Sequence, residues 1–126
     1  ETLAHLHYWS VQMTRAAGKQ EVLAAFRTSS RIALINTGDG LVALNTVKEL
    51  MADRGRPHEN LYEVALWADM LRVQGDELFY AYMVDNQAIV IPETIDAIRA
   101  LTGIVKNPSE SMARTNEALG IGQELI

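Results

Sequence analysis

Hydrophobic and polar positions along the chain follow two spacings, one typical of β-strands and the other of α-helices. Rough alternation, or a short apolar run between turn residues, predicts five strands, at 2–13, 31–35, 61–67, 71–74 and 77–84. Apolar residues at helical spacing predict helices over 19–28 and 44–51, and two later helices that begin near Pro92 and Asn107. Gly103 and Gly120 mark the ends of these later helices.

The order of these elements predicts the fold class. Strands and helices alternate at first, three consecutive strands follow, and the chain ends in two helices. This order favours an α+β fold with a mixed, mostly antiparallel sheet and helices on one face. The apolar stripe of Ile95, Ile98 and Leu101 is interpreted as core, and Tyr8 and Trp9 as packing residues.

Composition narrows the class of protein. The 126 residues are 48% hydrophobic and 21% charged, as in an ordinary globular domain. A net charge of −5 argues against a nucleic-acid partner, which requires a basic face. No apolar stretch has transmembrane length and no secretory signal is visible, so we expect a cytoplasmic protein without a membrane partner. Because the chain starts at Glu1 within a predicted strand, we also expect it to be a piece of something larger.

Two histidines are the first candidates for chemistry. His5 and His7 are two residues apart on a predicted strand, so their side chains share one face. Such a pair can be structural, can act as a general acid or base near neutral pH, or can bind a metal. His58 has no ligand spacing to the pair, and we assign no metal site. The absence of cysteine excludes a cysteine nucleophile within these residues.

Three polar residues, Asp85, Asn86 and Gln87, follow the last predicted strand. An amide there either satisfies backbone groups at the strand end or binds a carboxamide, because an amide both donates and accepts hydrogen bonds. Two other polar segments have simpler interpretations. The loop at 36–40 lacks a phosphate-binding glycine pattern and is interpreted as a turn, and the arginines at 54–57 as the positive end of a helix, with anion recognition as the alternative.

Several segments together carry a resemblance to a known family. They are 2–7 (TLAHLH), 55–57 (GRP) followed by 60–64 (NLYEV), 76–80 (DELFY), 91–101 (IPETIDAIRAL) and 115–122 (TNEALGIG). In this order they resemble the closing part of the archaeal-type (type II) glyceraldehyde-3-phosphate dehydrogenases, over nearly the whole chain. The helix-opening segment at 92–101 is the most specific of them.

The resemblance implies an activity and roles for named residues. The family oxidises glyceraldehyde 3-phosphate with NAD or NADP and phosphate to 1,3-bisphosphoglycerate, in glycolysis and gluconeogenesis, through a thiohemiacetal and a thioester on a cysteine. By resemblance, His5 or His7 is the base and Asn86, with Gln87 beside it, contacts the nicotinamide. Many members have His-Gln-Glu where this chain has Asp85-Asn86-Gln87.

The resemblance also implies partners. Residues 1–107 would be the C-terminal part of a catalytic domain, and 108–126 a terminal helix that packs on a nucleotide-binding Rossmann domain. The cysteine and the dinucleotide-binding motif lie upstream in the family, so the chain would work with the remainder of its own enzyme, as a homotetramer, and be inactive alone. The alternative is a stand-alone, non-catalytic α+β binding or regulatory module.

Overall fold

The computed structural model describes residues 4–122, and Thr2 and Leu3 of the first predicted strand lie outside this range. The elements are β1 (Ala4–Gln12), α1 (Lys19–Arg27), β2 (Ile32–Ile35), α2 (Leu44–Asp53), β3 (Val64–Trp67), β4 (Arg72–Gln74), β5 (Glu77–Asp85), α3 (Val90–Thr102) and α4 (Pro108–Leu119). Two short 3-10 helices, η1 (Thr37–Asp39) and η2 (Pro57–Glu59), follow β2 and α2. Each predicted strand and helix is present, with ends shifted by a few residues.

The five strands form one sheet around β5. The order is β1-β5-β3-β2, and the short β4 also pairs with β5. β5 runs antiparallel to β1, β3 and β4, whereas β2 and β3 are parallel. The predicted α+β fold with a mixed, mostly antiparallel sheet is therefore confirmed.

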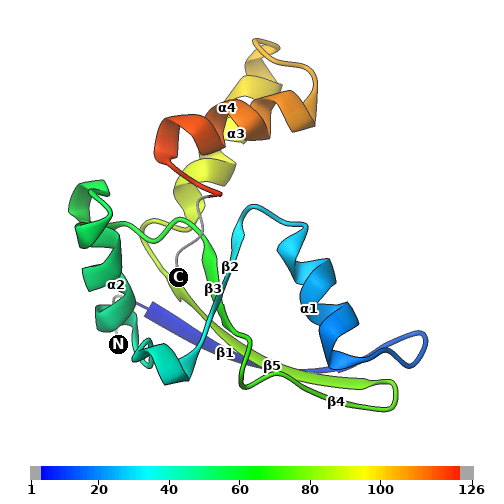
Figure 1. Cartoon of the computed structure of the whole chain (residues 1–126). Coiled ribbons are helices and arrows are strands. Elements are labelled where there is room, and N and C mark those ends of the chain that lie inside the picture. The colour runs from blue at the N-terminus through cyan, green and yellow to red at the C-terminus, as the bar shows by residue number, and fades with distance from the viewer. Residues whose placement is uncertain (1–3, 123–126) are drawn as a thin grey trace.

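Helices cover both faces of the sheet, so the expectation of helices on one face is wrong. Figure 1 shows α1 and α2 on opposite sides of the strands. The α2 side buries Ala33, Ile35, Val47, Met51, Ala65, Trp67, Ala81 and Met83. The α1 side buries Val22, Leu23, Leu66, Leu71 and Leu78, with Ile32 and Leu34 packed against them. The reason lies in β2 and β3, whose sequences IALI and VALW are apolar at every position and need cover on both faces.

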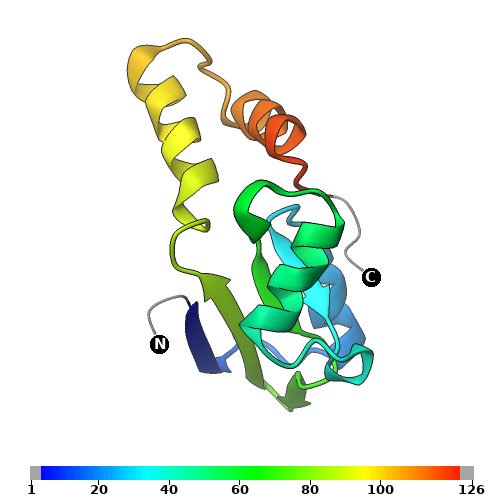
Figure 2. The same cartoon turned by 90° about the vertical axis from the view of Figure 1, so that its left-hand side faces the viewer.

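The helical hairpin of α3 and α4 projects beyond the end of the sheet (Figure 2). A small apolar cluster of Tyr62, Ala88 and Ile121 lies at its base. Ile98 is 53% and Leu101 87% exposed, so the interpretation of the α3 stripe as core is wrong, although Ile95 is half-buried. The helix turns its polar side inward instead, toward hydrogen-bonding partners on α4 and at Arg31, just before β2.

The outer part of β1 is also less covered than its sequence suggests. Tyr8 is 72% and Trp9 46% exposed, so neither is the packing residue expected from its aromatic character. β1 pairs with β5 on one side only, and Tyr8 and Trp9 point to opposite faces of this outer strand. No helix in the described range 4–122 is long and apolar enough to cross a membrane.

Candidate active site at one end of the sheet

The two histidines of β1 lie on the same face of the sheet, as their spacing predicts. His5 pairs with Val84 and His7 with Tyr82 across the antiparallel β1–β5 ladder. Their imidazole centroids are 6.0 Å apart in an edge-on arrangement. The His7 ring also stacks on Tyr82, with centroids 4.8 Å apart and planes 18° from parallel. His5 is exposed and His7 half-buried, so His5 is the more accessible imidazole.

The polar turn after β5 lies at the same end of the sheet as this pair. The end of β5 lies beside the beginning of β1 (Figure 2). The register sets Ala4 opposite Asp85, and Asn86 is the next residue. Asn86 is half-buried and Gln87 exposed. The fold therefore brings together at one edge two groups of predicted site residues that are about 80 positions apart in the sequence.

Asp85 is a site residue whose role sequence reasoning missed. Only 3% of it is exposed, and its Oδ1 accepts hydrogen bonds from the N–H groups of Gln87 at 3.0 Å and Ala88 at 3.2 Å. Its Oδ2 accepts from Lys48 Nζ at 2.9 Å. An aspartate followed by two amides is a local signal for such an Asx turn. In contrast, no residue near Asp85 in the sequence indicates that Lys48 is its partner. The Asp85 carboxylate thus satisfies two backbone N–H groups at this strand end.

The electrostatics of Asp85 favour its ionised form. Burial acts to raise the pKa of Asp85, but hydrogen bonds from Lys48 and from the N–H groups of Ala88 and Gln87 outweigh it. The pKa of this carboxyl therefore lies below its usual value. A negative charge held by one ammonium and two N–H groups makes the turn a rigid support for the neighbouring Asn86 side chain.

The other polar motifs serve the fold. In the 36–40 loop, the Thr37 N–H donates to Asp69 Oδ2 at 2.8 Å, so an acidic group occupies the place where a phosphate would bind. Arg56 forms a double hydrogen bond with the buried Glu63, which contradicts anion recognition by this arginine. Within residues 4–122, no three histidine or acidic side chains gather as a metal site.

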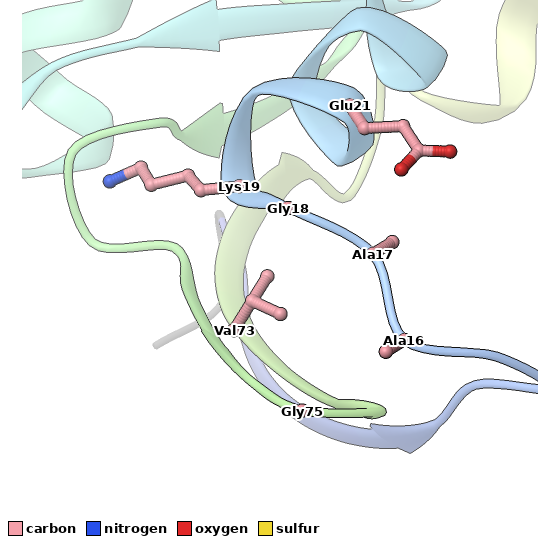
Figure 3. A pocket seen from close by; sticks show the side chains of 7 residues that line it. All are labelled: Ala16, Ala17, Gly18, Lys19, Glu21, Val73 and Gly75. Carbon is pink, nitrogen blue, oxygen red and sulfur yellow. The ribbon is translucent and has the colours of Figure 1, made fainter.

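A surface hollow of about 480 Å³ lies between the segment before α1 and the β4–β5 hairpin (Figure 3). Gly75 of the hairpin turn belongs to it, at the end of β5 opposite Asp85. The side chains of Lys19 and Glu21 point in opposite directions there, and Glu21 pairs with Arg15. The hollow gathers no convergent polar groups and is not part of the candidate site.

The fold and site define an α+β domain that presents imidazole and carboxamide groups at one end of its sheet. In sequence, the chain is homologous to archaeal glyceraldehyde-3-phosphate dehydrogenases, which confirms the resemblance. It is 35% identical over 120 residues to that of Methanobrevibacter smithii and 38% identical over 122 residues to that of Archaeoglobus fulgidus. These matches cover 95% and 97% of the chain but 36% and 35% of the relatives.

A third relative, the glyceraldehyde-3-phosphate dehydrogenase of Methanopyrus kandleri, is 36% identical over 120 residues, which are 95% of this chain and 34% of that protein. The chain thus spans about a third of the length of the curated relatives that it matches. No family model matches the chain.

Proposed function

We propose that this chain acts as part of a phosphorylating, NAD- or NADP-dependent glyceraldehyde-3-phosphate dehydrogenase, to which it supplies the base histidine and a nicotinamide contact. The observation that carries the proposal is the β1–β5 register, which sets Ala4 opposite Asp85 and so brings the histidine pair and Asn86 to one edge. The names of the homologous archaeal proteins support the reaction.

His5 is the better candidate for the base. It is exposed, and it lies two pairs nearer to the Asp85–Asn86 turn than His7. The His7 ring is held against Tyr82, which suits a supporting role. His5 would accept the proton of the substrate-derived hydroxyl as its carbon is oxidised, because imidazole takes up protons near neutral pH. The attacking cysteine would come from the remainder of the enzyme, since this chain has none.

Asn86 suits one contact to the nicotinamide cofactor. Its side-chain amide both donates and accepts, as the carboxamide of nicotinamide requires, and the Asp85 turn holds its backbone. NAD or NADP held there would supply the hydride acceptor of the reaction. Gln87 is exposed beside Asn86 and is a second candidate contact.

Exposed apolar side chains support a partner and disfavour the stand-alone module. Leu6, Tyr8, Ile98 and Leu101 are 51%, 72%, 53% and 87% exposed, on β1 and α3. Contiguous exposed apolar surface marks interaction sites in soluble proteins. We propose that residues 1–107 form part of the catalytic domain, that the 108–126 segment meets the nucleotide-binding part, and that the complete enzyme is a cytoplasmic homotetramer.

The mass of the intact polypeptide from the source organism, measured under denaturing conditions, is the first test. A mass near three times 14.0 kDa, with oxidation of glyceraldehyde 3-phosphate by the purified protein, supports the proposal. A mass of 14.0 kDa with no second chain and no oxidation favours the binding module and overturns it.

Variants of the active protein then test the residues. His5→Gln should lower kcat by about 10²- to 10⁴-fold, the usual contribution of a general base, and His7→Gln should have a smaller effect. Asn86→Ala should raise the Kd for the cofactor about five- to tenfold, the value of one hydrogen bond. An unchanged kcat in both histidine variants would exclude the pair as the base.

A further inference from the structure

We propose that Asp85 and Lys48 are positioning residues, which hold the Asn86–Gln87 turn in the geometry that binds the nicotinamide. The inference rests on the proposed function of Asn86 and adds two residues to it. Lys48 lies on α2, 37 positions before Asp85, and neither residue is a predicted site residue.

Asp85 closes the turn with three hydrogen bonds. Its carboxylate Oδ1 accepts from the N–H groups of Gln87 and Ala88. Its backbone carbonyl accepts from the N–H of Ile89 at 3.0 Å. The two carboxylate bonds are charge-assisted, and such bonds are about twice as strong as neutral ones. Asp85 therefore holds the backbone N–H groups of the three residues that follow Asn86.

Lys48 makes this arrangement possible. The Asp85 side chain is only 4% exposed, and a buried carboxylate without a counter-charge is strongly unfavourable. The ammonium of Lys48 provides the counter-charge at 2.9 Å. The position of Lys48 is fixed by its neighbour Val47 and by Met51, both fully buried between α2 and the sheet. The packing of α2 against the sheet therefore fixes the position of the turn through the Lys48–Asp85 ion pair.

The Lys48–Asp85 ion pair also influences the distance between the turn and the histidines. Asp85 is the last residue of β5, and its register partner Ala4 precedes His5 on β1. A shift of the turn would therefore change the distance between the Asn86 amide and the His5 imidazole. Misplacement of reacting groups by about 1 Å costs on the order of 100-fold in rate. The ion pair would act on catalysis through Asn86 without touching the substrate.

Three variants of the native dehydrogenase test the inference, with Glu49→Gln as a matched control on the exposed side of α2. Lys48→Met removes the charge and keeps an unbranched chain, Lys48→Arg keeps the charge, and Asn86→Ala removes the proposed contact. The readouts are the Kd for NAD or NADP, amide hydrogen exchange at Gln87 and Ala88, and kcat. A melting curve shows that each variant is folded.

We expect Lys48→Met to raise the Kd about five- to tenfold, as Asn86→Ala does, and to accelerate exchange at both amides. Lys48→Arg should keep the Kd and the exchange rates of both amides close to those of the unaltered protein, and Glu49→Gln should leave them unchanged. Faster exchange with unchanged Kd in Lys48→Met would mean that the pair only stabilises the turn, and would overturn the positioning role. Unchanged Kd in Asn86→Ala would instead overturn the proposed cofactor contact, and the positioning role with it.

Discussion

Removal of Arg56 should destabilise the protein more than the loss of any exposed ion pair. Arg56 and Glu63 are joined by two hydrogen bonds of 2.6 and 2.5 Å, and their side chains are 6% and 2% exposed. Arg56→Met leaves the Glu63 carboxylate buried without its cation, which costs about 3–5 kcal/mol. At roughly 4 °C per kcal/mol for a domain of this size, Tm should fall by about 12–20 °C.

The double variant Arg56→Met/Glu63→Leu separates the charge from the other contacts of Arg56. It removes both charges, so most of the penalty should disappear. It still lacks the hydrogen bond of 2.9 Å from Arg56 to the Gly120 carbonyl, which contributes about 1 kcal/mol. We therefore expect the double variant to be less stable than the unaltered protein and more stable than Arg56→Met by about 2 kcal/mol or more.

Urea unfolding followed by far-UV circular dichroism measures these differences. Glu110→Gln is the control, because the Arg114–Glu110 pair joins exposed side chains four residues apart on α4. It should cost about 0.5 kcal/mol or less. If Arg56→Met costs no more than this control, the ion pair is not desolvated in solution, and the reasoning from burial is wrong.

Two further predictions concern acid and a helix cap. The pKa values of Asp85 and Asp96 are lowered in the folded protein, because hydrogen bonds outweigh burial, which would raise them. Their contribution to stability is therefore full above the unfolded pKa of about 3.9 and is lost as the pH falls through the folded pKa values. The urea midpoint should therefore drop less between pH 5 and pH 2.5 in Asp96→Asn than in the unaltered protein. Asn107→Ala removes the side-chain acceptor for the N–H groups of Ser109 and Glu110 and should cost about 1 kcal/mol in urea unfolding, whereas an equal loss in Asn107→Ser would contradict a capping role.

Local sequence signals were sufficient to predict the strands and helices, but not which of their faces other parts of the protein cover. The β4–β5 hairpin follows from Gln74-Gly75-Asp76, since Gly75 has a φ of +63° that favours glycine at a tight turn. The parallel pairing of β2 with β3 depends on contacts 32 residues apart and has no local signal. On α3, periodicity correctly places Ile98 and Leu101 on a common face, but it carries no information on whether anything covers that face.

The same distinction applies to the candidate site. The shared face of His5 and His7 follows from the two-residue period of a strand and was predictable. Their position beside Asn86 depends on the β1–β5 register, which one sequence does not reveal. The Asp85 turn has a local pattern, whereas the counter-charge on Lys48 comes from another helix. Electrostatic partners that are distant in the sequence cannot be predicted from local patterns.

The segment that carries Asn86 is fixed at both of its ends by charge. Before it, Asp85 is held by Lys48 of α2. After it, α3 is held by Arg31, which immediately precedes β2 and whose guanidinium donates to Asp96 at 2.5 Å and to Glu93. Hydrogen-bonded ion pairs are directional, whereas apolar packing tolerates sliding. Because Ile98 and Leu101 of α3 face outward, these directional contacts, together with the small apolar cluster at the base of the helix, set the angle at which α3 leaves the sheet. The orientation of the turn at 86–89 therefore depends on five charged residues, and neutralising either Lys48 or Arg31 should loosen the turn more than truncating the exposed apolar side chains of α3.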